Sequence, residues 1–209
     1  IVGGGPPLIV GAALSAKTLG TDRVGVSFTG DGGSNQGTTF EAMNLAVVLQ
    51  VPAIFLFENN GYGEGTAAGY AVGSKDIASR AAAFGMPALK VDGADIFAVY
   101  DTCQKAVKHC RAGKGPITIE ASITRFRGHF EGDAQAYRGK DEVKRLMRDL
   151  DCLKIASDNA IKKKLVTKAQ LQKIDEEVAA YINESANAAL AAPGPDVSEL
   201  LTDVYSSAY

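Results

Sequence analysis

The chain has 209 residues, 22 Lys and Arg against 24 Asp and Glu, a formal net charge of −2 and 46% hydrophobic residues. This length suffices for one α/β domain with a full core, and the composition is that of a globular protein. The charge argues against nucleic-acid and anionic-membrane binding, and no apolar run could span a membrane. The three cysteines (Cys103, Cys110, Cys152) form no Cys-x-x-Cys pair, so we expect free thiols in a cytoplasmic setting.

Helix-like and strand-like segments alternate over the first 122 residues. The patterns predict helices at about 8–19, 38–49, 76–84 and 95–111, and strands at 23–29, 53–57, 88–92 and 117–121. We expect the first of these strands to be wholly buried and the second helix to offer the core Phe40, Met43, Leu45, Val47 and Val48. This order predicts an α/β fold, a parallel sheet with helices on both faces. Ligands of such sheets bind beyond the carboxyl ends of the strands.

The pattern changes after this core. We expect a single domain made of the core 1–122, a polar, glycine-punctuated loop at 123–140 and C-terminal helices over 141–209. Thr167 and Gln170 have the spacing of a capping box at the start of one of these helices. The chain starts at Ile1 rather than Met, and we expect it to be the middle of a longer chain that lacks its N-terminal part.

A glycine-rich loop, Gly30 to Gly37, follows the first predicted strand and precedes a helix. Glycines let a phosphate approach the backbone at a helix N-terminus, and the carboxylate of Asp31 suggests a divalent cation between it and that phosphate. Read alone, the loop is equally consistent with a tight turn in which Asp31 caps the helix. The spacing fails the dinucleotide-binding Gly-x-Gly-x-x-Gly pattern, the P-loop pattern and the EF-hand pattern.

Two asparagines, Asn59 and Asn60, follow the next predicted strand. An amide oxygen is a suitable ligand for Mg²⁺, which often takes few of its six oxygens from protein. Asn-Asn-Gly alone also fits a turn with left-handed residues. If the two strands are neighbours, the two loops lie side by side and predict a shared magnesium site.

Gly-Asp-Gly followed about thirty residues later by Asn-Asn resembles the signature of thiamine-diphosphate enzymes. The stretch from Gly30 to Thr66, with Asn35-Gln36-Gly37, Phe40-Glu41-Ala42, Pro52 and Tyr62-Gly63, resembles the alpha subunit of the decarboxylating component of 2-oxo acid dehydrogenase complexes. The resemblance runs from Ile1 to about Arg148 and more loosely to the end. It implies a thiamine-diphosphate-binding fold with thiamine diphosphate and Mg²⁺ as cofactors.

The resemblance also implies site residues. Asp31 and Asn60 would be side-chain Mg²⁺ ligands, and Tyr62 would give its backbone carbonyl. The backbone of Gly32 and Gly33 would approach the diphosphate. Val2 would line the aminopyrimidine through its backbone.

The polar loop carries the third part of the resemblance, Arg125-Phe126-Arg127-Gly128-His129-Phe130-Glu131-Gly132-Asp133. In the family the matching loop covers the cofactor, so Arg125 would reach the diphosphate, and His129 would assist proton transfer or stabilise the intermediate near the thiazolium. Pyruvate-type subunits carry a Ser at the position of Phe130. The run Gly-His-Phe-Glu-Gly-Asp is more similar to acetoin dehydrogenase alpha subunits, which favours acetoin as substrate over pyruvate or a branched-chain 2-oxo acid.

An oxidoreductase is therefore expected, one that cleaves acetoin and passes the acyl group to a lipoyl carrier or an artificial acceptor. The resemblance implies a beta subunit, in an alpha2–beta2 assembly, a lipoyl-bearing acyltransferase and a small-molecule substrate as partners, with no nucleic acid and no membrane. Pyruvate or a branched-chain 2-oxo acid is the alternative substrate. A subunit or fragment that is inactive without its beta partner is the non-enzymatic alternative. A nicotinamide-binding domain with Glu58 on the ribose is a third reading, disfavoured by the glycine spacing.

Overall fold

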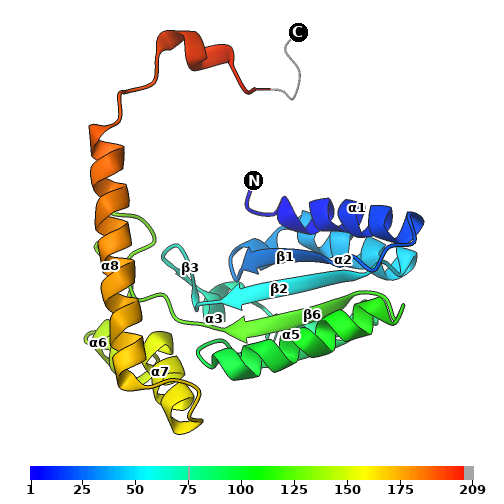
Figure 1. Ribbon diagram of the computed structural model, residues 1–209. Coiled ribbons are helices and arrows are strands. Elements are labelled where there is room, and N and C mark those ends of the chain that lie inside the picture. The colour runs from blue at the N-terminus through cyan, green and yellow to red at the C-terminus, as the bar shows by residue number, and fades with distance from the viewer. Residues whose placement is uncertain (75, 205–209) are drawn as a thin grey trace. The chain divides into compact units, whose positions relative to one another are not determined.

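The computed structural model describes residues 1–74 and 76–204. The chain divides into two compact units, Ile1–Ala156 and Ser157–Tyr209. The first unit holds a four-stranded sheet of β1 (Gly25–Gly30), β2 (Ala53–Asn59), β6 (Ile117–Ser122) and β5 (Ala88–Asp92), in that spatial order (Figure 1). All neighbouring pairs are parallel, with Gly30 opposite Glu58 and Asn59 opposite Ser122. The loops that follow β1, β2 and β6 therefore leave the sheet on the same side, at the carboxyl ends of the strands.

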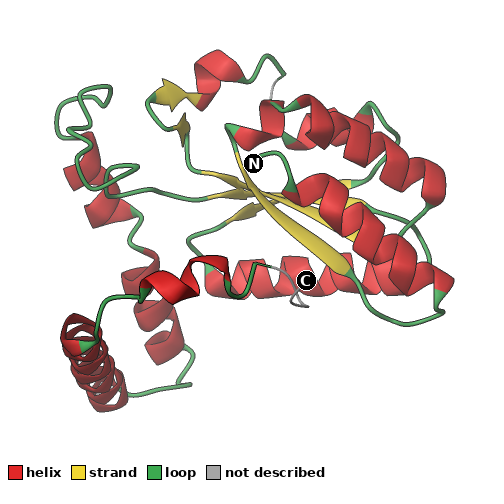
Figure 2. Cartoon of the chain, turned by 90° about the horizontal axis from the view of Figure 1, so that it is seen from above, coloured by secondary structure: helices red, strands yellow, loops and turns green. Residues whose placement is uncertain are grey.

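Helices cover both faces of this sheet, as predicted (Figure 2). The helices α1 (Gly5–Thr18), α2 (Gly37–Leu49) and α4 (Ala78–Ala82) contribute to one core cluster, centred on Phe55, Phe57 and Met43. The helix α5 (Ile96–Arg111) packs on the other face, where Ile54, Ile119 and Cys110 are buried. The strand β2 thus sends alternate residues into two different cores, which explains its almost continuous apolar sequence.

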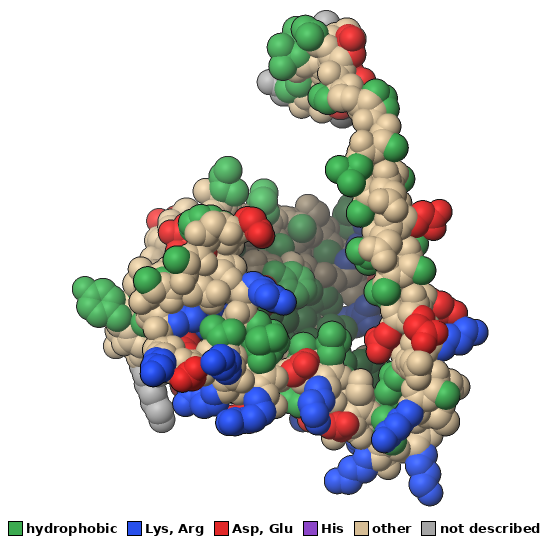
Figure 3. All heavy atoms as spheres, turned by 90° about the vertical axis from the view of Figure 1, so that its left-hand side faces the viewer, with side chains coloured by type: hydrophobic (Ala, Val, Ile, Leu, Met, Phe, Trp, Pro, Cys, Tyr) green, Lys and Arg blue, Asp and Glu red, His purple; other side chains and the backbone are tan. Residues whose placement is uncertain are grey.

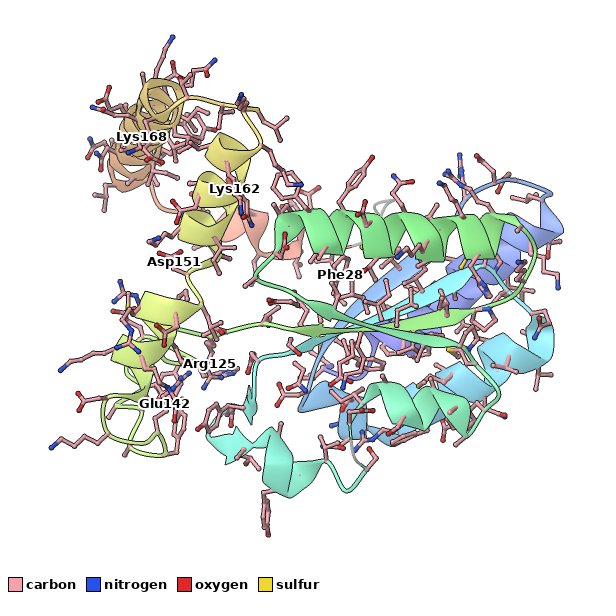
Figure 4. The ribbon with its side chains drawn as sticks, turned by 90° about the horizontal axis from the view of Figure 1, so that it is seen from below. Phe28, Arg125, Glu142, Asp151, Lys162 and Lys168 are labelled. Carbon is pink, nitrogen blue, oxygen red and sulfur yellow. The ribbon has the colours of Figure 1, made fainter. Side chains whose placement is uncertain are left out.

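One edge strand is less buried than the sequence predicts. In β1 the alternate residues Val26 and Phe28 are 38% and 66% exposed, so the expectation of a wholly buried strand is wrong. Phe28 lies opposite Leu56, on the α5 side of the sheet (Figure 4), but α5 packs on β2, β5 and β6. Leu45 and Val48 of α2, expected in the core, are also exposed, because α2 buries only the face that carries Met43 and Ala46.

The second polar loop is more regular than expected. Residues 62–67 form a two-stranded antiparallel hairpin, β3 (Tyr62–Gly63) and β4 (Thr66–Ala67), followed by the one-turn helix α3 (Ala68–Ala71). Glu64 makes the turn with a positive φ of 52°. The hairpin stiffens the chain next to Asn60, and its two-residue strands are too short to give a pattern in the sequence.

Beyond β6 the predicted loop is irregular up to α6 (Glu142–Asp149), as expected. The chain then forms α7 (Cys152–Lys162), α8 (Lys168–Ala191) and a short 3₁₀ helix (Val197–Leu201). Thr167 and Gln170 form the predicted capping box at the start of α8. Ile174, Val178, Tyr181 and Ile182 of this helix are each at least half exposed, and hydrophobic side chains are visible along it in Figure 3.

The cysteines of the described residues are free thiols, as expected, with Cys110 buried and Cys152 exposed. Burial raises the pKa of Cys110 to about 11, so its thiol is inert at neutral pH. Within the described ranges no helix is long and apolar enough to cross a membrane. The division into a core, a cofactor-covering loop and C-terminal helices stays a prediction.

Candidate functional site

The loop after β1 buries a single carboxylate at the end of the sheet. Asp31 is 3% exposed, and its backbone carbonyl accepts a 2.6 Å hydrogen bond from Ser34 Oγ. Thr39, in the first turn of α2, donates to the carbonyl of Gly33 at 3.1 Å. The loop is therefore tied to itself and to the helix that follows, which leaves the carboxylate fixed in place.

The loop after β2 presents the two asparagines. Asn59 Oδ1 accepts from the backbone N–H of Gly61 at 3.2 Å, and Asn60 Oδ1 accepts from that of Tyr62 at 3.0 Å. Each side chain thus folds back on the backbone two residues ahead, as asparagines do in turns. Asn60 keeps a free lone pair on its amide oxygen, since an amide oxygen has two.

The two loops meet backbone to backbone. A Cβ added to Gly32 would lie 3.2 Å from Gly63 Cα, and one added to Gly63 would lie 3.1 Å from Gly32 Cα. A side chain on either glycine would press against the backbone of the other loop, so glycine on both sides permits this close approach. Asp31 and the Asn60 segment lie side by side in consequence, as the sequence predicted for neighbouring strands.

The charge of Asp31 is only partly compensated. Burial raises the pKa of its carboxyl group, and the backbone N–H groups of Asp31 and Asn60 and the positive charge of Arg125 oppose that rise. A buried carboxylate of this kind favours a bound cation, which restores the interactions lost with water. No group of three or more His, Cys, Asp and Glu suited to a metal exists among the described residues. Any cation here would rely on amide and carbonyl oxygens beside one carboxylate.

The start of the chain reaches the same place. A Cβ on Gly33 would lie 3.1 Å from Val2 Cγ1 and 2.9 Å from Thr29 Cγ2. Thr38 donates to the carbonyl of Gly3 at 3.0 Å, which holds the Val2 segment against the loop. Val2 itself is 71% exposed. The structure therefore brings Val2 beside Gly33, and the role of Val2 at the aminopyrimidine stays a prediction.

Arg125 lies against the hairpin, in the segment that follows β6 (Figure 4). Its Nη1 donates to the backbone carbonyl of Tyr62 at 3.3 Å, and its Nη2 donates to the carbonyl of Glu64 at 2.7 Å and to the Tyr137 hydroxyl at 2.6 Å. Its Nε is buried without a hydrogen-bond partner. The guanidinium thus occupies the Tyr62 carbonyl, the oxygen that the resemblance assigns to the metal.

His129 lies at the rim of this cluster. Its Nδ1 is 3.5 Å from Arg125 Nη1, its Nε2 is 3.8 Å from Glu64 Oε1, and its side chain is 48% exposed. Its backbone N–H donates to Asp133 Oδ2 at 2.8 Å, and the Tyr137 hydroxyl donates to the same oxygen at 2.6 Å. These bonds lower the pKa of Asp133 to about 2, the Tyr137 bond most of all. The backbone of His129 is held by Asp133, whereas its imidazole ring is about half exposed to solvent.

A second arginine supports the first. The Arg138 side chain is 4% exposed, donates to the Arg125 carbonyl at 2.7 Å, and lies 3.3 Å from Glu142 Oε1. Its guanidinium carbon lies 5.0 Å from the centre of the Tyr62 ring. Glu142 also accepts from the Tyr62 hydroxyl at 3.3 Å. Sequence reasoning missed Arg138 because an arginine in a polar, aperiodic segment carries no sign of burial.

Two further charged residues were missed, Arg80 and Glu120. Glu120 is 2% exposed, in the strand β6, and Arg80 reaches from α4 to Ser34 and Asn35. A signal for Glu120 existed, because it interrupts a run of residues that predicted a buried strand. Arg80 had none.

Comparison with known proteins matches residues 1–198 to the family described as "Dehydrogenase E1 component". The alpha subunit of acetoin:2,6-dichlorophenolindophenol oxidoreductase from Cupriavidus necator is 46% identical over 207 residues, 99% of this chain and 62% of that protein. The same subunit from Bacillus subtilis is 45% identical with the same shares covered. The pyruvate dehydrogenase E1 component subunit alpha of Rhizobium meliloti is 40% identical over 204 residues, 98% of this chain and 59% of that protein.

This chain thus spans about three fifths of the length of these relatives. A solved structure of a candidate thiamin diphosphate-dependent enzyme from Mycobacterium smegmatis is 25% identical with a TM-score of 0.48, over 59% of this chain and 22% of that one. That overlap is too small to add to the argument. The match over residues 1–198, together with the parallel sheet and the paired loops at its edge, shows that the chain belongs to the dehydrogenase E1 component family.

Proposed function

We propose that this chain is the alpha subunit of a thiamine-diphosphate-dependent acetoin dehydrogenase. The observation that supports this most is the contact between Gly32 and Gly63, which joins the buried Asp31 to the Asn60 segment in one oxygen-rich site. The two relatives at 46% and 45% identity are named as subunits that act on acetoin.

The residues at this site fit a magnesium diphosphate by their donor chemistry. Mg²⁺ prefers oxygen ligands and usually takes only a few from protein. One buried carboxylate, one amide oxygen and one backbone carbonyl, from Asp31, Asn60 and Tyr62, give such a set. The two glycines, Gly32 and Gly33, have no side chain that would keep a phosphate away from the backbone. The unpartnered Nε of Arg125 is a donor suited to the same anion.

Thiamine diphosphate, when bound, supplies the carbanion chemistry that breaks the carbon–carbon bond of the substrate. In our proposal the chain's residues hold and orient the cofactor. Arg125, which now donates to the Tyr62 carbonyl, would hold a diphosphate oxygen, and the Tyr62 carbonyl would then be available to the metal. The exposed ring of His129 donates or accepts a proton at the substrate. Val2 lines the aminopyrimidine through its backbone.

A 2-oxo acid, pyruvate or a branched-chain homologue, is the second candidate substrate. The relative from Rhizobium meliloti, named as a pyruvate dehydrogenase subunit, is 40% identical to this chain. Phe130 is 66% exposed in the loop beside His129, at the position where the resemblance gives pyruvate-type subunits a Ser. We infer that acetoin is favoured, because the run from Gly128 to Asp133 resembles acetoin-type subunits and the relatives named for acetoin are 46% and 45% identical to this chain.

The partners belong to the proposal as well. We infer a beta subunit in an alpha2–beta2 assembly, a lipoyl-bearing acyltransferase as acceptor and a cytoplasmic location. A chain that only supports a catalytic beta subunit is the alternative, and cofactor binding that does not depend on Asp31 would favour it.

Calorimetry tests the cofactor site. The full-length chain, assembled with its beta subunit, is titrated with thiamine diphosphate in Mg²⁺, as wild type and as Asp31→Ala. Loss of the charged ligand should weaken binding on the order of 100-fold. Asp22→Ala is the matched control, because the Asp22 side chain is 83% exposed and lies away from the site. Equal affinities of Asp31→Ala and wild type would reject the assignment.

Substrate choice is tested by turnover of the assembly on acetoin and on pyruvate, with 2,6-dichlorophenolindophenol as electron acceptor. Faster reduction with acetoin supports the proposal. Faster reduction with pyruvate replaces it with the second candidate.

A further inference from the structure

Arg80, on the short helix α4, directs both terminal nitrogens of its guanidinium group to the loop that carries Asp31. Its Nη1 donates to Ser34 O at 2.9 Å and to Ser34 Oγ at 3.1 Å, and its Nη2 donates to Asn35 Oδ1 at 2.8 Å. Its Nε donates to Ser74 Oγ at 3.0 Å. Ser34 Oγ in turn donates to the Asp31 carbonyl, so Arg80 is one residue removed from the proposed metal ligand.

Glu120 makes the corresponding contacts on the other loop. Its Oε1 accepts from Asn59 Nδ2 at 2.8 Å, and its Oε2 accepts from the backbone N–H of Ala78, the first residue of α4, at 2.9 Å. The Ile123 N–H donates to the Asn59 carbonyl at 3.0 Å. The carboxylate therefore fixes Asn59, the neighbour of Asn60, to the same helix from which Arg80 extends.

These bonds form one continuous path. It runs from Asp31 through Ser34 and Arg80 into α4, and from Ala78 through Glu120 to Asn59. The two loops thus have a second connection besides the contact of Gly32 with Gly63. Glu120 is buried and Arg80 is partly buried, an arrangement that costs free energy unless each hydrogen bond is made.

We propose, resting on the function proposed above, that Arg80 and Glu120 are positioning residues that set the separation of Asp31 and Asn60. On the two loops, their hydrogen bonds go to neighbours of Asp31 and Asn60 rather than to the two proposed ligands themselves. They act through Ser34 and Asn59, and their effect is on the distance between two oxygen ligands that come from different loops.

Metal selectivity distinguishes this role from a general effect on the fold. Mg²⁺ requires near-octahedral geometry with oxygens at about 2.0–2.1 Å, whereas Ca²⁺ accepts about 2.3–2.6 Å and irregular geometry. A small change in the separation of the two ligands should therefore weaken cofactor binding in Mg²⁺ more than in Ca²⁺. A partly unfolded site would lose both.

The test is calorimetric titration of the alpha–beta assembly with thiamine diphosphate, in Mg²⁺ and separately in Ca²⁺. Arg80→Lys keeps the charge but loses the planar fork. We expect it to weaken binding about 10-fold in Mg²⁺, at the low end for residues that support metal ligands, and less than about threefold in Ca²⁺. Arg111→Lys is the control, because Arg111 is exposed and pairs with Asp22.

Glu120→Gln gives a second, independent measurement. Its amide keeps the size and one acceptor, but its NH₂ group then faces either the Ala78 N–H or the Asn59 amide, donor against donor. The same preferential loss in Mg²⁺ is expected. Equal losses in both ions, or none, in Arg80→Lys would overturn the positioning role. Wild type that binds no thiamine diphosphate would instead overturn the proposed function, so the two failures are distinguishable.

Discussion

His129 combines a backbone held by Asp133 with a half-exposed ring, which is what a proton-transfer residue needs. We predict that His129→Ala lowers turnover by ~10²–10⁴-fold, the usual contribution of general acid–base help, while thiamine diphosphate affinity changes little. The measurement is turnover at saturating cofactor in the alpha–beta assembly. His109→Ala serves as control, since His109 lies in the last turn of α5, outside the site loops. A loss below about threefold would show that the ring only contacts Glu64.

The Asp31 carboxylate lowers the folding stability of the cofactor-free chain, whereas in our proposal it strengthens cofactor binding. Its raised pKa means that the folded chain holds this proton more tightly than the unfolded chain. The stability of the cofactor-free protein therefore falls as the pH rises above about 4, the ordinary Asp pKa, through the raised value. We predict that Asp31→Asn stabilises the cofactor-free chain on the order of 1 kcal/mol at neutral pH, with the gain fading toward pH 4.

Urea unfolding of both chains at several pH values measures this gain. Asp133→Asn is a control of opposite sign, because the pKa of Asp133 is lowered to about 2. That variant should be destabilised at every pH above about 4, since the contribution of such a group is lost only below its unfolded pKa. An Asp31→Asn chain less stable than wild type at neutral pH would show that the carboxylate is already compensated.

At the scale of single elements, α8 depends on its first turn. Thr167 Oγ1 accepts from the Gln170 N–H at 3.3 Å, and Gln170 Oε1 accepts from the Thr167 N–H at 2.9 Å. We predict that Thr167→Ala costs ~1 kcal/mol of helix stability, while Thr167→Ser, which keeps the oxygen, costs less. Hydrogen exchange of the amides of Lys168–Leu171 reads this locally. Exchange that is equally fast in both variants would mean that packing, not the cap, holds this turn.

Some elements were predictable and others were not, for physical reasons. The strand at 88–92 and the capping box were correct because local propensity and hydrogen bonding decide them. The exposure of Phe28 depends on how far α5 extends over the sheet, which no local pattern records. The β3–β4 hairpin has too few residues to alternate.

At the scale of the whole molecule, the parallel sheet follows from the alternation of helices and strands. Asp31 and Asn60 were predictable as a pair because neighbouring parallel strands end at one edge. The contact of Arg80 with Ser34 was not, because the two residues lie 46 positions apart along the chain and meet only through the fold.

The uncovered side of β1 has a consequence for how the chain behaves at high concentration. In the part of the chain that the structure describes, β1 pairs on one edge only, and Phe28 lies exposed beside the free edge. Free edges with apolar neighbours promote self-association. We expect the light scattered per unit mass of protein to rise with concentration when the chain is produced without a partner, and to rise less in Phe28→Thr. Leu19→Gln, which removes an apolar side chain 75% exposed at the end of α1, should change nothing. Equal scattering of wild type and Phe28→Thr would contradict this. The solubility of the chain would then depend on the exposed side chain of Phe28 in β1 more than on the net charge of the chain.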